Sequence, residues 1–372
     1  MQKKGILFVI NDFNIGGAEV FVLRLGKALL SNYEIFIKEL YPENSKLEIK
    51  ENFINAGFKV VETPSLSKKH QTVFWKMNAL FYLFGVKEVY NKLKKWQIKR
   101  LFNISLKKNN IKIIHSHYYS SDTFVRENIT LASFKWLITM HGDYNQLNFE
   151  KIEDKATFLK NARFNLEQCD VVTYVSDINC FLINKYQFKV NQLKKVYLGY
   201  EQPIFSPVKN GQFTFCMVAR ANPTKGWRET VEAFNLFRSK YNDGRLICVA
   251  PKEGIIIELE EENRLNINID FVGYSENPGE FINESDVCLL PTYFESESTP
   301  YSVIEYLAYS KPVISTNAGE IEQMLCVGAE KKAGIILPIN KNKISNYKLN
   351  LGFIIYEKSC LIYKLIKLTH LT

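Results

Sequence analysis

Short apolar runs rich in β-branched and aromatic residues recur along the whole chain, and most are followed by a segment with helical spacing. The runs include residues 5–10 (GILFVI), 33–40 (YEIFIKEL), 111–117 (IKIIHSH), 212–220 (QFTFCMVAR) and 285–291 (SDVCLLP). Buried strands that alternate with helices are typical of a parallel sheet with helices on both faces. This alternation places the chain in the α/β class.

A chain of 372 residues has room for two such domains, because domains of about 150 residues are common. Residues 198–212 (LGYEQPIFSPVKNGQ) hold two prolines and two glycines and lack a helical period, which is typical of a linker. We therefore predict two Rossmann-like, doubly wound domains, over residues 1–205 and 206–338. Residues 339–372 form an atypical tail without the upstream alternation, which favours a truncated or frame-altered end.

Composition excludes several classes of protein. Hydrophobic residues make up 46% of the chain and charged residues 23%, which is ordinary for a folded enzyme and excludes a disordered chain. The seven cysteines include no C-x-x-C pair and lie mostly in apolar runs, so we expect buried reduced thiols. No apolar run reaches the length of about 18 residues that a membrane-spanning helix needs. A cytoplasmic location is therefore predicted.

The net charge of +9 is concentrated in one segment, because residues 59–112 contain thirteen Lys and Arg but only two acidic residues. Within it, residues 68–108 mix these cations with aromatic side chains. Three interpretations compete: a solvated pair of helices over a core, an anionic membrane surface, or nucleic acid. No nucleic-acid-binding motif accompanies the charge. We predict peripheral association with the inner face of a membrane, because basic helices with apolar residues bind there.

A pair of glutamates brackets the predicted start of a helix in the stretch ESTPYSVIE. Thr299 is a candidate N-cap and Pro300 fits the first helical position. The stretch follows a predicted strand, and the carboxyl ends of parallel strands are where ligands bind in such sheets. A helix N-terminus attracts phosphate, and carboxylates such as Glu297 and Glu305 suit sugar hydroxyl groups beside it. Alternatively, Glu297 favours the helix dipole and Glu305 is a surface residue.

Two cations follow another predicted strand in the stretch VARANPTKGW. Arg220 lies at the strand end, and Lys225 precedes the glycine that opens a helix. A guanidinium fork and an ammonium group together suit a diphosphate. The alternative is a solvated basic loop.

The first domain has a weaker set of candidates at predicted strand ends. Gly16 and Gly17 allow a ligand to approach the backbone at a helix start, although no G-x-G-x-x-G dinucleotide fingerprint is present. His115 and His117 are expected to point to both faces of a strand end, and His141 follows a later strand. No cysteine joins the histidines and no D-x-D pair is present, so no metal site is predicted.

The chain resembles the family-4 (group 1) retaining glycosyltransferases of the GT-B fold. The resemblance covers about residues 5–338 and rests on GGAE, HSH, HG, the segment LGYEQPIFSP, R-x4-K-G and the E-x7-E of the two glutamates. The family often has a glycine-rich sequence after the first glutamate, where this chain has STPYS, and this departure bears on the choice of donor.

The resemblance implies a donor domain over residues 206–338 and an acceptor domain over residues 1–205. It implies that Arg220 and Lys225 hold the diphosphate of a nucleotide-sugar donor, that Glu297 contacts the donor sugar, and that Glu305 contacts the ribose. By the same resemblance Gly17 and His141 face the transferred sugar. His141 and Glu297 are the candidate catalytic residues, and Gly16, Gly17, Arg220, Lys225, Thr299, Pro300 and Glu305 are the candidate donor-binding residues.

The function expected from this resemblance is hexosyl transfer to a glycan or lipid-linked acceptor in the synthesis of a cell-surface polysaccharide. No cofactor, no metal and no nucleic-acid partner are expected. Two alternatives remain, a nucleotide-sugar epimerase on the same fold and a non-catalytic protein that binds sugar nucleotides.

Overall fold

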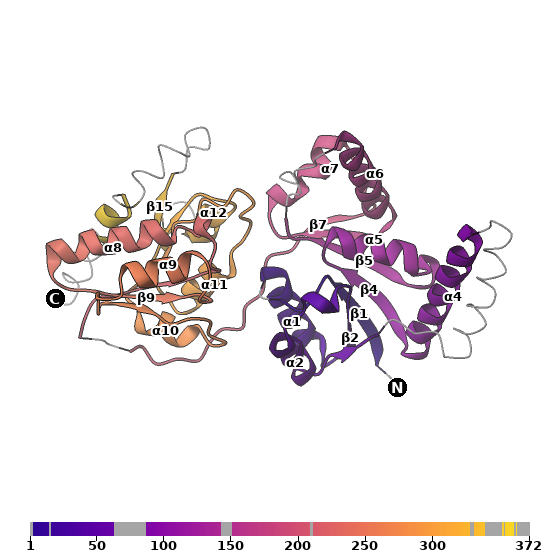
Figure 1. The fold of residues 1–372 in the computed structure, drawn as a ribbon, viewed down its shortest axis with the longest axis horizontal. Helices are drawn as coiled ribbons and strands as arrows, with labels where there is room; N and C mark the ends of the chain where they lie inside the picture. The colour runs from indigo at the N-terminus through magenta and orange to yellow at the C-terminus, as the bar shows by residue number, and fades with distance from the viewer. Residues whose placement is uncertain are drawn as a thin grey trace. The chain divides into compact units, whose positions relative to one another are not determined.

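The computed structural model divides the chain into two compact units, Met1–Gly199 (unit 1) and Tyr200–Thr372 (unit 2), shown in Figure 1. The sequence had placed the boundary near residue 205. The described residues are 3–14, 16–62, 87–142, 151–208, 211–327, 331–338, 352, 354–360 and 362. No helix among these residues is long and apolar enough to cross a bilayer.

Unit 1 is built on a seven-stranded sheet in which every neighbouring pair is parallel, with the order β3-β2-β1-β4-β5-β6-β7. The strands are β1 (Lys4–Ile10), β2 (Tyr33–Glu39), β3 (Lys59–Val60), β4 (Ile111–Ser116), β5 (Lys135–Met140), β6 (Val171–Tyr174) and β7 (Leu193–Lys195). Residues 6–10 of β1 are all buried, as expected of a central strand covered on both faces.

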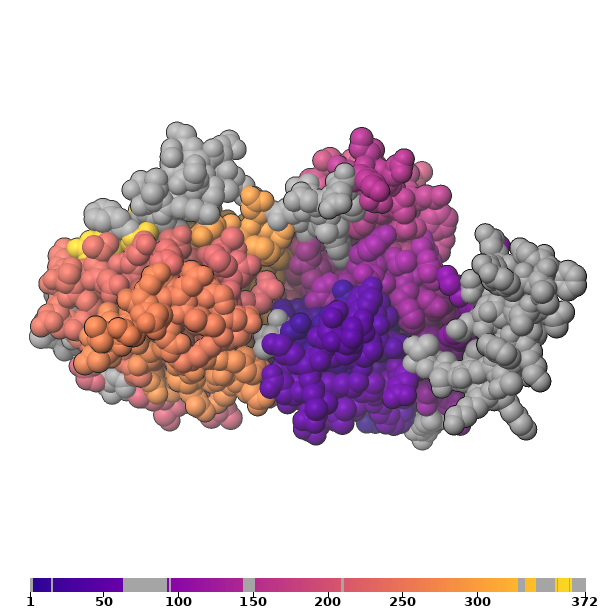
Figure 2. Space-filling view, viewed as in Figure 1, coloured from indigo at the N-terminus to yellow at the C-terminus, as the bar shows by residue number. Residues whose placement is uncertain are grey.

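Helices surround this sheet in Figure 1. They are α1 (Gly17–Leu29), α2 (Leu47–Asn55), α4 (Lys87–Lys108), α5 (Tyr119–Asn128), α6 (Ile152–Gln168) and α7 (Phe181–Tyr186). On the face seen in Figure 2, the indigo surface of unit 1 belongs to the N-terminal part of the chain, which contains α1 and α2. The fully buried Trp136 of β5 anchors the core and donates its indole N–H to Ser116 Oγ (2.9 Å).

Unit 2 repeats the architecture with a six-stranded parallel sheet of order β10-β9-β8-β11-β12-β15. Its strands are β8 (Thr214–Val218), β9 (Arg245–Val249), β10 (Ile269–Phe271), β11 (Val287–Leu290), β12 (Val313–Thr316) and β15 (Gly334–Leu337). A short antiparallel pair, β13 (Cys326–Val327) and β14 (Lys331–Lys332), stands apart from it. Its helices are α8 (Trp227–Tyr241), α9 (Ile255–Glu262), α10 (Gly279–Glu284), α11 (Tyr301–Ala308) and α12 (Ile321–Leu325).

The order of strands fixes where ligands bind in each unit. In unit 1 the chain winds outward from β1 through β2 to β3 and then returns to β4 on the other side of β1. In unit 2 it does the same from β8, and returns to β11. Ligands of open parallel sheets bind at such switch points, beyond the carboxyl ends of the strands. The site should therefore be sought after β1 and β4 in unit 1, and after β8 and β11 in unit 2.

Part of the predicted tail is ordered against unit 2. Residues 354–360 are helical, and Ile355, Cys360 and Ile362 are buried in the core of that unit. So few residues give little periodic signal, and the sequence did not predict a helix there. The rest of the stretch from 339 to 372 lies outside the described residues.

Candidate functional site

In unit 2 the loop after β8 carries the two predicted cations. Arg220 lies two residues beyond the strand, and its carbonyl oxygen accepts the indole N–H of Trp227 (2.8 Å), so its backbone is tied to the start of α8. The Arg220 side chain is exposed, and it has no ion pair within the described part of the chain. A short 3-10 helix, η4 (Pro223–Lys225), then brings Lys225 back over the sheet.

The placement of Lys225 depends on the glycine that follows it. Gly226 has a φ of +88°, which a side chain rarely tolerates, and a Cβ there would lie 2.6 Å from the carbonyl oxygen of Pro291. Glycine thus lets the turn before α8 pack directly on the segment after β11. This contact brings Lys225 to the switch point between β8 and β11.

Lys225 meets the predicted Glu297 there in a buried ion pair. Lys225 Nζ lies 2.5 Å from Glu297 Oε2, and the two side chains are each only 8% exposed. Thr292 Oγ1 donates to the same carboxylate oxygen (2.9 Å), and the ring of Phe294 lies 5.1 Å from the ammonium group. The structure therefore brings together a cation and a carboxylate that are 72 positions apart in the sequence.

The start of α11 differs by one residue from the prediction. Pro300 has a ψ of 130° and is the N-cap, so the helix begins at Tyr301, and Thr299 is not its cap. The prediction was wrong because Pro300 adopts an extended rather than a helical ψ. Thr299 is nevertheless notable, since its Oγ1 is buried and has no hydrogen-bond partner among the described residues. A buried hydroxyl without a partner beside a helix N-terminus is suited to a ligand oxygen.

Glu305 is buried in the second turn of α11, at 8% exposure. The alternative that it is a surface helix residue is therefore wrong. The pKa of the neighbouring Tyr309 is raised by burial and by the negative charge of Glu305. A buried carboxylate one turn inside the helix is a specific hydrogen-bond acceptor and not a solubilising group.

In unit 1 the predicted glycines lie at the start of α1. Gly16 is the extended N-cap residue, and Gly17 is the first residue of the helix, with open space where a side chain would begin. Glu19, in the first turn, is buried and accepts the hydroxyl of Tyr118 (2.7 Å). Tyr118 comes from the loop after β4, so this bond joins the two sides of the unit 1 switch point.

The three histidines form one stack beside these residues. His117 Nδ1 lies 3.1 Å from His141 Nε2, and His115 Nε2 lies 2.7 Å from Thr139 Oγ1. The rings of His115 and His117 are 4.2 Å apart, so the expectation that they point to both faces of the strand is wrong. The reason is the period of two along a strand, which puts residues i and i+2 on the same face.

Burial keeps these imidazoles neutral. It lowers the pKa of His115 to about 3, helped by His141, and lowers the pKa of His141 to about 4. The pKa of His117 is also lowered well below its ordinary value, by burial and then by its two histidine neighbours. Within the described ranges, no group of histidine, cysteine or acidic side chains is arranged to hold a metal ion.

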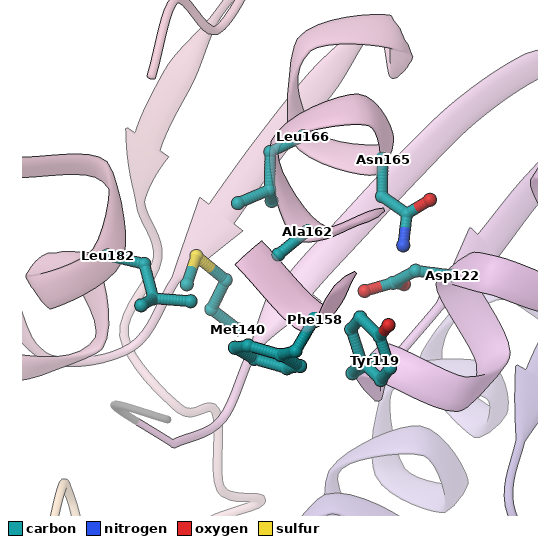
Figure 3. Close-up of a pocket in the computed structure, with 8 residues that line it drawn as sticks. All are labelled: Tyr119, Asp122, Met140, Phe158, Ala162, Asn165, Leu166 and Leu182. Atoms are coloured by element: carbon teal, nitrogen blue, oxygen red, sulfur yellow. The ribbon is translucent and has the colours of Figure 1, made fainter. Parts of the chain in front are cut away.

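A cavity lies behind this rim in unit 1, between α5 and α6 (Figure 3). Its volume is about 10 Å³, room for about one water molecule and far too small for a sugar or nucleotide. Figure 3 shows Asp122, Asn165 and Tyr119 at one end and apolar side chains at the other. The cavity is therefore a packing feature of unit 1 and not the functional site.

Sequence reasoning missed three contributors to the unit 2 site, Thr292, Phe294 and Gly319. Gly319 has a φ of +57°, and a Cβ there would lie 2.3 Å from the carbonyl oxygen of Ser298. The glycine lets the loop after β12 pass against the segment that carries Glu297. A glycine directly after a predicted strand was the available signal for it, whereas Thr292 and Phe294 carried none.

The sequence of unit 2 matches a known protein family. Residues 201–348 match the family model described as glycosyl transferases group 1. The capsular polysaccharide biosynthesis glycosyltransferase CapH of Staphylococcus aureus is 26% identical over 251 residues, which are 63% of this chain and 68% of CapH.

Solved structures align over nearly the full length of the chain. HepE of Anabaena, determined in complex with UDP, has a TM-score of 0.66 at 13% identity and aligns over 99% of both chains. Sucrose-phosphate synthase of Thermosynechococcus elongatus has a TM-score of 0.61 at 17% identity, over 99% of this chain and 98% of that one. The solved structures confirm the predicted GT-B fold. The family match in the second half of the chain and the likeness to CapH indicate an enzyme of the glycosyltransferase class, with a group 1 glycosyltransferase domain over residues 201–348.

Proposed function

We propose that this enzyme is a retaining, family-4 type hexosyltransferase that uses a nucleoside diphosphate sugar and acts in the synthesis of a cell-surface polysaccharide. The observation that carries the proposal is the buried pair of Lys225 and Glu297, set between the exposed Arg220 and the N-terminus of α11. A group with two negative phosphates and an attached sugar satisfies this combination of cations, helix N-terminal amides and carboxylates.

The chemistry follows from the charges. Breaking the bond between the sugar and the diphosphate leaves negative charge on the phosphate oxygens and positive character on the sugar. Arg220, Lys225 and the first amides of α11 stabilise the leaving group. Lys225 and the helix amides are held in place before the reaction and need no reorganisation. Glu297 lies beside the ammonium group, where it can accept sugar hydroxyls once the diphosphate takes over Lys225. No side chain is assigned as a covalent nucleophile.

The remaining predicted residues have supporting roles in this proposal. Thr299 Oγ1 donates to a phosphate oxygen, Pro300 fixes the start of α11, and Glu305 accepts the ribose hydroxyls. Gly17 leaves room at the start of α1 for the donor, Gly16 lets the carboxylate of Glu19 lie against the backbone there, and His141 contacts the transferred sugar as a neutral imidazole. Because the two cations of unit 2 neutralise the diphosphate, we propose that turnover needs no metal, and full activity in EDTA is the expected result.

The comparisons support the donor and acceptor classes. HepE is known in complex with UDP and with UDP-glucose, and CapH is named for capsular polysaccharide biosynthesis. We therefore propose a UDP-hexose as the first donor to test, and a glycan or lipid-linked glycan on the cytoplasmic side of the membrane as the acceptor.

The decisive experiment compares two ligands, UDP and uridine, by calorimetry and then tests turnover. UDP should bind at least about tenfold more tightly than uridine, because only UDP reaches the cations. Equal affinity for both would contradict the proposal. With acceptor glycans and a panel of UDP-hexoses, transfer with retention at the anomeric carbon is expected. Epimerised nucleotide sugar formed without acceptor would favour the epimerase, and binding without turnover would favour the non-catalytic alternative.

A lipid-linked acceptor is supported by the surface of α4. Residues 68–86 of the predicted basic region lie outside the described residues, but α4 belongs to it. Leu93, Trp96, Arg100, Ile104 and Lys107 recur at helical spacing, and Leu93, Trp96 and Ile104 are exposed. Cations beside exposed apolar side chains on one face suit an anionic bilayer surface.

Flotation tests this surface directly. The protein should float with vesicles that contain phosphatidylglycerol and not with pure phosphatidylcholine. Trp96→Ala and Lys95→Glu should each weaken flotation, whereas Lys112→Glu, an exposed cation at the start of β4, should not. Flotation that is unaffected by either α4 variant would contradict this assignment.

A further inference from the structure

His117 is fully buried and has not been given a role above, yet its ring is hydrogen-bonded to the imidazole of His141. Its ring lies between Phe8 (centroid distance 5.6 Å), Phe21 (5.7 Å) and His115 (4.2 Å), which hold it in place on several sides. The bond to His141 runs from Nδ1 of His117 to Nε2 of His141 over 3.1 Å. A rigid, buried ring that holds a second, partly exposed ring is suited to fixing the second one's orientation and proton.

Counting protons along this bond leaves two arrangements. Both rings are neutral, so each carries one N–H, and one of the two facing nitrogens must donate. In the first arrangement His117 donates from Nδ1, and His141 must then carry its own proton on Nδ1. In the second His141 donates from Nε2, and His117 carries its proton on Nε2.

The surroundings of His117 decide between them. Nε2 of His117 is buried and has no hydrogen-bond partner among the described residues. In the second arrangement this nitrogen would bear an N–H with nothing to accept it, and orphaned buried N–H groups are rarer than unsatisfied acceptors. In the first arrangement only a ring lone pair is left there. The first arrangement is therefore the favoured one.

We propose that His117 is a positioning residue that holds His141 in the tautomer with its proton on Nδ1. His141 then presents a neutral N–H donor on its free side, since its Nδ1 has no partner in the described part of the chain. Such a group binds an oxygen lone pair without adding a charge to the site. The identity of that oxygen, a hydroxyl of the transferred sugar, rests on the function proposed above, whereas the tautomer does not.

The proposal is tested by the ring nitrogens of His141. In protein labelled with 15N at histidine, Nδ1 of His141 should resonate as a protonated ring nitrogen and Nε2 as an unprotonated one. The reverse assignment overturns the proposal, whatever the enzyme turns out to transfer.

Three variants separate positioning from packing. His117→Asn places an amide N–H where Nδ1 was, so it should keep the His141 tautomer and hold kcat/KM within about threefold. His117→Leu fills similar space without a donor, so His141 should populate both tautomers and kcat/KM should fall about 10- to 100-fold. Thr139→Val is the matched control, since it removes the partner of His115 and leaves the bond to His141 in place.

The outcomes are distinct. Loss of activity in His117→Leu, with an unchanged melting temperature and rescue in His117→Asn, supports the proposal. Equal activity in the Asn and Leu variants, or an unchanged His141 tautomer in the Leu variant, overturns it. If the wild-type tautomer is as stated but no transfer occurs with any donor, the proposed function fails and the positioning role stands.

Discussion

The two units share one topology but differ in the chemistry at their switch points. In unit 2 the residues after β8 and β11 include basic and acidic side chains, those of Arg220, Lys225 and Glu297, with Glu305 buried one turn inside α11. In unit 1 the residues after β4 and β5 are imidazoles that burial keeps neutral. A doubly wound sheet determines where a ligand is held, but the side chains at the strand ends determine whether the site can bind a charged ligand.

This difference suggests a division of labour. Unit 2 can neutralise an anion, because the turn at Gly226 sets the ammonium group of Lys225 in place and Arg220 lies exposed on the same loop. The imidazoles of unit 1 can donate or accept hydrogen bonds without adding charge, which suits a neutral sugar or an acceptor hydroxyl. Substitutions at the two rims should therefore affect different kinetic quantities.

The largest effect is expected for Lys225→Ala. Loss of the ammonium group should lower kcat/KM about 10²- to 10³-fold, as removal of one electrostatic stabiliser typically does, and should weaken UDP binding as measured by calorimetry. Lys252→Ala is the matched control, because Lys252 is an exposed cation of the same unit, paired with Glu260 at 2.6 Å. If UDP binds Lys225→Ala as tightly as it binds the wild type, the proposed contrast between a charged and a neutral unit is wrong.

The next effect concerns the backbone that places this cation. Gly226→Ala should lower the free energy of unfolding by about 2 to 4 kcal/mol, because it combines a strained positive φ with a close contact to the Pro291 carbonyl. Gly211→Ala is the control, as nothing lies within 4 Å of a Cβ at Gly211. Urea unfolding monitored by circular dichroism measures both, and equal stability of the two variants would contradict this account of the turn.

Much of unit 2 could be predicted from the sequence because its signals are local. Strand, glycine turn and helix start follow one another around Lys225, and each restricts the backbone through neighbouring residues. The same holds for Glu297 and Glu305, because one helix and the residues just before it determine the spacing between them. The pairing of Lys225 with Glu297 could not be predicted from local pattern, because that contact depends on β8 and β11 becoming neighbours.

Unit 1 was harder for the same reason. The contact of His117 with His141 depends on the register of β4 beside β5, where Ser116 pairs with Ile138. The motifs HSH and HG do not determine how β4 and β5 pair. The neutral state of these rings could not be predicted from the sequence either, since it comes from the aromatic side chains of other elements packed around them.

The next prediction tests the contrast between the two units in unit 1, where a smaller effect is expected. His141→Ala should lower kcat about tenfold and leave the Kd for UDP unchanged, because a neutral hydrogen bond is worth about 1 to 1.5 kcal/mol. With a pKa of about 4, His141 is not titrated between pH 5 and 8, so the variant and wild type should have parallel pH profiles for kcat in that range. A change in UDP affinity, or profiles that diverge near pH 6.5, would contradict the assignment of a neutral role.

The last prediction concerns stability and not activity, at Asp122, the one acidic group that lines the cavity of Figure 3. Burial raises its pKa to about 7, although a hydrogen bond with Ser116 opposes the shift. In the unfolded chain its pKa is about 3.9, so the native state binds the proton more tightly. The stability that this group contributes is fully present below pH 4 and is lost as the pH rises through 7.

Asp122→Asn has no proton to lose, so it should gain in stability relative to wild type by roughly 1 to 3 kcal/mol between pH 5 and 7. Urea unfolding at several pH values measures the difference. Asp170→Asn is the opposite control, because burial alone would raise the pKa of Asp170 but hydrogen bonds from Lys135 and the Trp136 amide lower it. That variant should lose relative stability as the pH rises from 3 to 5. If Asp122→Asn is equally stable relative to wild type at every pH, the carboxyl group is not protonated in the fold, and the description of unit 1 as the neutral half fails at this position.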